Sequence, residues 1–218
     1  MAGLMASILP TGAVAEERLD DLVEAPLWPE EEALIARAAP GRRREFATTR
    51  ACARRVLRRL GSTPGPLLPG CLGAPIWPVG VVGSLTHCPG YRAAAAAPAD
   101  VTRSLGIDAE PNAPLPPGVL TEIATPREQA GLPGPAAVCW DRLLFCAKEA
   151  VYKAWSPLTR VFLGFEDLEV VLAPEVGAFA AEVTAASTPQ APRLFIGRWT
   201  MGEGLLAAVA IPAARGRP

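Results

Sequence analysis

The chain has only two lysines, Lys148 and Lys153, and both lie within five residues of Glu149. The other nineteen basic side chains are arginines. An ammonium binds phosphate as a compact point charge and can give up a proton, which a guanidinium does not do in proteins. The segment therefore indicates a phosphate-binding site with a candidate base. An ordinary Glu-Lys pair on a helix surface is the alternative.

A pair of carboxylates, Asp108 and Glu110, stands at the end of a predicted strand. Side chains two residues apart on a strand point to the same face, so these two acids would lie side by side. A hard divalent ion such as Mg²⁺ relieves their repulsion, because it takes oxygen ligands and substrate phosphates. Glu149 could supply a third carboxylate. Two solvated acids at a strand end are the plainer interpretation.

The only histidine, His87, follows a predicted strand and precedes a Pro-Gly turn. Hydroxyl donors, including Thr86, surround it, which favours a phosphate contact over a structural role. Nine arginines lie between residues 37 and 59, against one acid. Arg42 and Arg50 bracket the start of a predicted helix, where a phosphate would be stabilised. The arginines from Arg54 to Arg59 are expected on a solvated helix face.

The composition restricts the class of protein. A net charge of -1 argues against electrostatic binding of nucleic acid, and 50% hydrophobic residues suffice for a core. Neither a Walker loop nor a GxGxxG turn is present, which argues against ordinary ATPases, kinases and dinucleotide enzymes. Five cysteines without CxxC spacing indicate free thiols in a reducing compartment. We expect a cytoplasmic protein without a membrane segment or secretory signal.

Hydrophobic periodicity predicts an α+β fold with antiparallel sheets. Residues 79–107 are expected to form a three-stranded meander, and residues 115–134 a loop with short helical stretches. The apolar residues at helical spacing within residues 136–155 form a stripe that is expected to lie in the core. The predicted helices are 30–38, 45–60 and 136–155, and the predicted strands are 4–9, 79–85, 91–97, 101–107, 166–172, 178–183, 194–199 and 205–211.

Three ordered motifs resemble those of the monomeric 4′-phosphopantetheinyl transferases. They are Gly83-Ser84-Leu85-Thr86-His87, Gly106-Ile107-Asp108-Ala109-Glu110 and the residues from Phe145 to Trp155. The resemblance covers roughly residues 40–170 and includes Arg42-Arg43-Arg44. It implies a monomer of two pseudo-symmetric halves, each a small antiparallel sheet packed with helices. We place the halves at residues 1–103 and 104–218.

The resemblance also implies a reaction. The phosphopantetheine arm of coenzyme A would move to a serine of an apo acyl or peptidyl carrier protein of polyketide, fatty-acid or non-ribosomal peptide synthases, releasing adenosine 3′,5′-bisphosphate. Asp108, Glu110 and either Glu149 or the Ala109 carbonyl would hold Mg²⁺. Glu149 would activate the serine. Coenzyme A would be contacted by Arg42, Arg50, Thr86, His87, Lys148 and Lys153, with Lys153 also stabilising or protonating the leaving group.

The sequence departs from the family in the loop before the Trp-Pro pair. Relatives often carry lysines there, but residues 69–75 have none. Contacts from Pro69, Gly70, Cys71 and Leu72 would therefore come from the backbone, and coenzyme A would bind more weakly. Two alternatives stay open: a degenerate module that binds coenzyme A or a carrier protein without transfer, and another Mg²⁺-dependent phosphotransferase or hydrolase.

Overall fold

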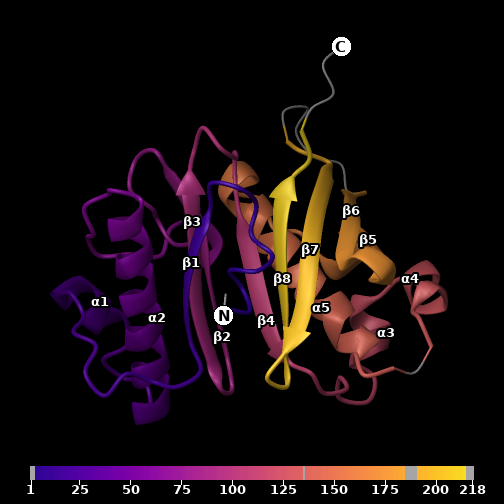
Figure 1. The fold of residues 1–218 in the computed structure, drawn as a ribbon, viewed down its shortest axis with the longest axis horizontal. Helices are drawn as coiled ribbons and strands as arrows, with labels where there is room; N and C mark the ends of the chain where they lie inside the picture. Colours follow the sequence, from indigo (N-terminus) through magenta and orange to yellow (C-terminus); the bar gives the residue numbers. More distant parts are fainter. Residues whose placement is uncertain (1–2, 135, 185–190, 215–218) are drawn as a thin grey trace.

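The computed structural model describes residues 3–134, 136–184 and 191–214. Two antiparallel sheets stand side by side (Figure 1). The first has the order β1-β3-β2, with β1 at Val14–Arg18, β2 at Val81–Cys88 and β3 at Tyr91–Pro98. The second has the order β4-β8-β7-β6-β5, and its strands are β4 Gly106–Pro111, β5 Leu168–Ala173, β6 Ala178–Val183, β7 Leu194–Gly202 and β8 Leu205–Pro212.

Helices pack on both sheets, which confirms the α+β prediction with antiparallel sheets. Helix α2 packs against the three-stranded sheet, and α5 packs against the five-stranded sheet. The helices are α1 Pro29–Leu34, α2 Pro40–Arg59, α3 Val119–Ile123, α4 Pro126–Gly131 and α5 Trp140–Thr159, with short 3-10 turns η1 Cys71–Gly73, η2 Phe165–Asp167 and η3 Pro174–Val176. The division of the chain at residues 103 and 104 stays a prediction.

Two strand predictions were wrong. Residues 4–8 form turns and not a strand. Met5 and Ile8 of this segment are buried against the face of β4 and β8 that α5 does not cover. Their apolar character reflects this burial and not strand pairing. The third strand of the expected meander, residues 101–107, begins only at Gly106 and pairs with β8 in the other sheet. Helix α2 also begins five residues earlier than predicted, with Pro40 in its first turn.

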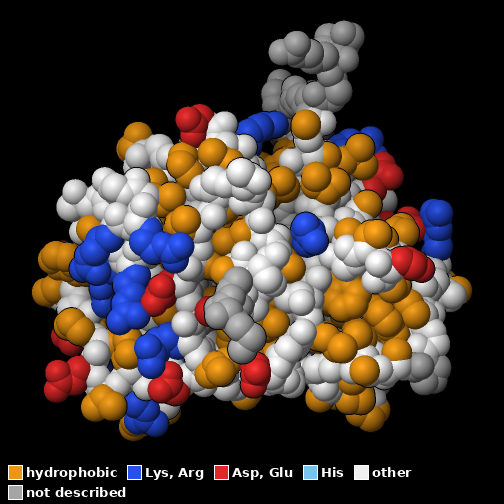
Figure 2. Space-filling view, in the orientation of Figure 1, with side chains coloured by type: hydrophobic (Ala, Val, Ile, Leu, Met, Phe, Trp, Pro, Cys, Tyr) orange, Lys and Arg blue, Asp and Glu red, His pale blue; other side chains and the backbone are white. Residues whose placement is uncertain are grey.

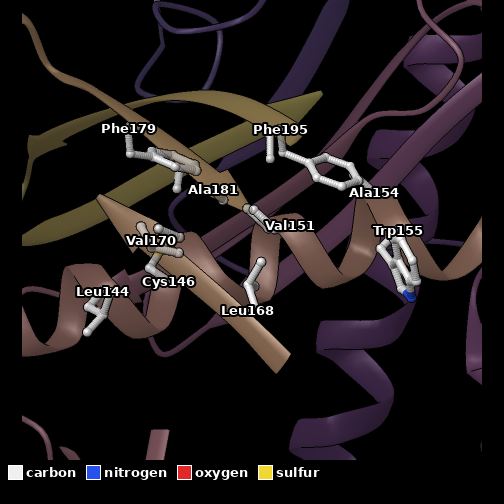
Figure 3. Packing of buried hydrophobic residues seen from close by; sticks show 14 of the residues in the cluster. Leu144, Cys146, Val151, Ala154, Trp155, Leu168, Val170, Phe179, Ala181 and Phe195 are labelled. Carbon is white, nitrogen blue, oxygen red and sulfur yellow. The ribbon is translucent and has the colours of Figure 1, made fainter. Parts of the chain in front are cut away.

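The core of the larger sheet forms against one stripe of α5 (Figure 3). Leu144, Val151 and Trp155 of this stripe are buried against β5, β6 and β7, as the periodicity predicted. At the β4 edge of the same sheet, Gly106 allows α5 to approach closely. A Cβ at Gly106 would lie 1.9 Å from the Ala150 carbonyl oxygen. A glycine is therefore required at this point, and it sets the distance between α5 and β4.

The alanine run of β3 is explained by its position in the sheet. Ala94 and Ala96 pack toward α2, whereas Ala93 and Ala95 pack toward the N-terminal segment. Both faces of this central strand are covered, so it is apolar throughout. The small alanine side chains let α2 approach one face of β3 and the N-terminal segment approach the other.

The surface is uneven in charge. Figure 2 shows basic side chains gathered over the half that contains α2, and hydrophobic side chains gathered over the half that contains the larger sheet. In the described residues, no helix is long and apolar enough to cross a membrane. All five cysteines are free, and Cys52, Cys88 and Cys146 are buried.

Candidate active site

A pocket of about 660 Å³ lies between the three-stranded sheet with its helix α2 on one side and helix α5 on the other. The end of α1, one face of α2, the loop at residues 69–75, strand β2 and the second half of α5 form its walls. The pocket thus brings together side chains from both halves of the chain. Of the predicted site residues, it is lined by Arg42, Arg50, Pro69, Leu72, Thr86, His87, Glu149 and Lys153.

Asp108 lies behind one wall of this pocket, on the face of β4 that meets α5. Its Oδ1 accepts hydrogen bonds from Lys153 Nζ at 2.6 Å and from Thr86 Oγ1 at 3.0 Å. Burial lowers the pKa of Lys153, but the charges of Asp108 and Glu149 outweigh it, so the pKa is raised. Lys153 is therefore a protonated ammonium near neutral pH in this arrangement.

Asp108 is buried, which argues against the plainer interpretation of two solvated acids. Its Oδ2 has no hydrogen-bond partner. Glu110, on the same face of β4, pairs with Arg142 at 2.9 Å. Burial and the charge of Asp108 raise the pKa of Glu110, and Arg142 opposes this rise. The two acids therefore lie close enough to repel each other.

Among the described residues, no group of three acidic, histidine or cysteine side chains is arranged as a metal site. The pair on β4 nonetheless fits a hard cation, because a buried carboxylate oxygen without a partner is costly and an oxygen-seeking ion would satisfy it. Asp108 Oδ2 is such an oxygen, and Glu110 stands beside it. Ala109, between them, has a buried side chain on the opposite face of the strand.

Glu149 extends from α5 into the pocket, one helical turn before Lys153. Burial raises the pKa of Glu149, Lys153 lowers it and Asp108 raises it further. A carboxylate with a raised pKa is a stronger base than a solvated one, which suits it to accept a proton from a hydroxyl.

His87 lies at the far end of β2, where its ring contacts Arg42 Nη1. The Glu45 Oε2 atom lies 3.9 Å from His87 Nδ1. Burial and the charge of Arg42 lower the pKa of His87. A neutral imidazole beside an arginine can accept or donate a hydrogen bond to a phosphate without adding to the charge.

Arg50 is held in the pocket wall between a ring and a carboxylate. Its guanidinium stacks 4.1 Å from the Phe46 ring, and its Nε lies 3.7 Å from Glu31. Burial lowers its pKa to about 10, although Glu31 raises it. Nε makes no hydrogen bond and faces the Glu31 carboxylate, so a contact of Arg50 with an anionic ligand would come from the other nitrogens of its guanidinium.

The prediction of a solvated face for the later arginines was wrong for Arg54. This side chain is buried and pairs with Glu31 at 3.2 Å. Further along α2, Arg55 pairs with Glu16 at 2.7 Å. These arginines connect α2 to α1 and β1, because a guanidinium can donate several hydrogen bonds at once.

Lys148 does not line the pocket, contrary to its predicted contact with the diphosphate of coenzyme A. Its Nζ is fully buried and pairs with Glu128 at 2.8 Å. The two lysines are five residues apart, and the rotation of the helix directs only Lys153 to the pocket.

The loop at residues 69–75 contributes Pro69 and Leu72 to the pocket. Gly70 and Cys71 belong to the same loop but do not line the pocket, and Cys71 is exposed. Sequence reasoning missed several lining residues, among them Thr49, Tyr152 and Ser156. Nothing in a single sequence distinguishes such residues from ordinary helix positions.

Comparisons with known proteins bear on this geometry. Residues 30–97 match the 4′-phosphopantetheinyl transferase N-terminal domain, and residues 104–182 match the 4′-phosphopantetheinyl transferase superfamily. The transferase Svp of Streptomyces mobaraensis is 52% identical, with 96% of this chain and 91% of the relative aligned. The chain belongs to the 4′-phosphopantetheinyl transferase superfamily.

Two further transferases of this superfamily are similar over nearly their full lengths. PptT of Mycobacterium tuberculosis is 48% identical over 93% of this chain and 95% of its own length. Npt of Nocardia iowensis is 46% identical over 95% and 99%. The family resemblance expected from the three motifs is thus confirmed, and the protein is an enzyme of this class.

Proposed function

We propose that this protein transfers the phosphopantetheine arm of coenzyme A to a serine of apo carrier proteins, with Mg²⁺ required. The observation that carries the proposal is one pocket that is lined both by Arg42, Arg50 and His87 and by Glu149 and Lys153. A polyphosphate substrate needs such donors, and a hydroxyl acceptor needs a base.

The phosphate donors line the pocket from both halves of the chain. Arg42, Arg50 and His87 would bind the 3′-phosphate region of coenzyme A, and Lys153 would face the diphosphate. Thr86 would act indirectly, because its hydroxyl proton is donated to Asp108. The apolar floor, which includes Phe46, suits an uncharged part of the ligand.

Glu149 and Lys153 would carry out the proton transfers. Glu149 would remove the proton of the serine hydroxyl as its oxygen attacks the phosphorus attached to the pantetheine arm. The bond from that phosphorus to the bridging oxygen would break, and adenosine 3′,5′-bisphosphate would leave. Lys153 would stabilise the charge on the leaving group or protonate it.

Asp108 and Glu110 would hold Mg²⁺, with Glu149 or the Ala109 carbonyl as a further ligand. The ion would neutralise charge on the diphosphate. Asp108 would in addition orient Lys153, since its Oδ1 already accepts the hydrogen bond from that ammonium.

We further propose that the protein acts as a cytoplasmic monomer on carrier domains of polyketide, fatty-acid or non-ribosomal peptide synthases, and not on nucleic acid or membranes. Incubation of the protein with coenzyme A, Mg²⁺ and a panel of apo carriers tests this. Mass spectrometry should show carriers that gain one phosphopantetheine group, and chelation of Mg²⁺ should abolish the gain.

The alternatives give different results in the same assay. A degenerate binding module would bind coenzyme A in calorimetry but modify no carrier. Another phosphotransferase or hydrolase would consume coenzyme A without a carrier adduct. Either result would overturn the proposed transfer.

A further inference from the structure

Lys148 lies in a closed network of buried polar groups away from the pocket. Its Nζ is 2.8 Å from Glu128 Oε2 and donates to the carbonyl oxygens of Phe165 at 2.9 Å and Leu168 at 2.8 Å. An ammonium has three protons, so every donor of Lys148 has a partner. The group therefore has no free donor for a ligand.

The Glu128 carboxylate completes this network. Its Oε2 also accepts the Thr125 amide at 2.8 Å, and its Oε1 accepts the Val170 amide at 2.7 Å. Glu128 thus connects the first turn of α4, the start of β5 and the middle of α5. Breaking one partner of such a buried pair leaves an uncompensated charge, which is strongly destabilising.

Contacts on two sides of α5 determine which side chains face the pocket. Successive residues on a helix point about 100° apart. Lys148 points to α4 and β5, Ala150 meets Gly106 of β4, and Glu149 between them lines the pocket. If α5 turned or slid, Glu149 would leave its place relative to the pocket.

We propose that Lys148 and Glu128 are positioning residues for the transfer reaction. They hold the rotation of α5 that directs Glu149 and Lys153 into the pocket, and neither touches the substrate. This inference rests on the proposed function of Glu149. The inference also explains why residue 148 is a lysine, although it does not line the pocket. Three oxygens converge on its Nζ, and the larger planar guanidinium of an arginine does not match that arrangement.

The informative variant is the double substitution Lys148→Met with Glu128→Gln. Both charges disappear together, so no uncompensated buried charge remains, and the glutamine oxygen can still accept one of the two backbone amides that Glu128 accepts. The chain is therefore expected to fold, with reduced stability. The single variant Lys148→Met would leave Glu128 charged and unpaired. The matched control is the double substitution Arg127→Gln with Glu169→Gln. These two side chains form an ion pair of 3.1 Å, Arg127 is exposed, and Arg127 directly precedes Glu128 in the sequence.

The measurements are kcat and KM for carrier modification, the affinity for coenzyme A by calorimetry and a crystal structure of the double variant. We expect kcat to fall by on the order of tenfold to a hundredfold, because small misplacements of a catalytic group are costly. The affinity for coenzyme A should fall much less than kcat, because Arg42 and Arg50 lie on α2 and His87 on β2, whereas Lys153 moves with α5. Glu149 and Lys153 should be displaced in the crystal. The control should match the wild type in every measurement.

A folded double variant with wild-type kcat and an unmoved Glu149 would overturn the inference. A loss of coenzyme A affinity as large as the loss of kcat would also overturn it, because that result indicates general loosening of the fold and not a rotation of α5 alone. If the wild type itself modifies no carrier, the proposed function fails, and the position of Glu149 in the crystal still decides whether the pair holds α5.

Discussion

The Thr86 hydroxyl, on β2 of the smaller sheet, donates a 3.0 Å hydrogen bond to Asp108 Oδ1, on β4 of the larger sheet. The same hydroxyl accepts the Ala109 amide at 3.2 Å. Strands β2 and β4 lie next to each other but belong to different sheets. One buried hydroxyl therefore joins the two sheets and orients a carboxylate of the candidate site.

Thr86→Val should destabilise the protein and impair transfer. The substitution keeps the shape but leaves the buried Ala109 amide unpaired, which costs about 1–3 kcal/mol. Urea unfolding measures the change in the free energy of unfolding. Thr86→Ser retains the hydroxyl, so its free energy of unfolding should fall much less than that of the valine variant. Equal stability of the valine and serine variants would contradict the role of this hydrogen bond.

Gly106→Ala should move α5 away from β4. The new Cβ would lie 1.9 Å from the Ala150 carbonyl oxygen, so the backbone must shift. We expect a loss of about 1–3 kcal/mol in unfolding free energy, and a larger relative loss of kcat than of coenzyme A affinity. Gly41→Ala, on α2, meets nothing within 4 Å, so it should leave kcat and coenzyme A affinity unchanged and should not destabilise the protein. Wild-type behaviour of Gly106→Ala would show that the approach is not required.

Glu149 should determine the acidic side of the pH profile of kcat. Burial raises its pKa, with opposition from Lys153, and a base must be deprotonated to act. Activity should therefore rise with pH through this raised pKa. Glu149→Gln should lower kcat sharply and remove that limb, whereas Glu175→Gln, at an exposed position, should change neither. An acidic limb that persists in Glu149→Gln would assign the titration to another group.

The same raised pKa has a consequence for stability. Between the pKa of the unfolded chain and the higher pKa of the folded protein, the native state holds a proton that the unfolded state has lost. Glu149 should therefore reduce stability as pH rises through that window. Unfolding free energies across this range, compared between the wild type and Glu149→Gln, measure the contribution. A difference independent of pH would argue against a pKa raised by burial.

Leu72→Lys should strengthen the binding of coenzyme A. Leu72 lines the pocket within a loop that has no basic residue, so an ammonium there would face the bound phosphates. Calorimetry should show tighter binding that weakens as salt is raised, because exposed charges are screened. Val176→Lys adds the same charge at an exposed position outside the pocket and serves as the control. No gain over that control would contradict the expectation.

The sequence alone predicted much of the secondary structure. Strand β6 occurs at the expected residues, and the apolar stripe of α5 is buried as the periodicity indicated. Such patterns depend on neighbours along the chain, and a single sequence contains that information. The N-terminal segment was misread as a strand, because an apolar run does not reveal what covers it.

The residue types of the three motifs, their order and the absence of nucleotide-binding loops were also determined by the sequence, and they were sufficient to indicate the family. The tertiary structure alone decided which of two lysines faces the pocket, that Asp108 is buried, and that Arg54 is paired and not solvated. These outcomes depend on contacts between residues far apart in the chain. The rotation of α5 is set by Glu128 and Gly106, and neither can be located from the sequence of α5 itself.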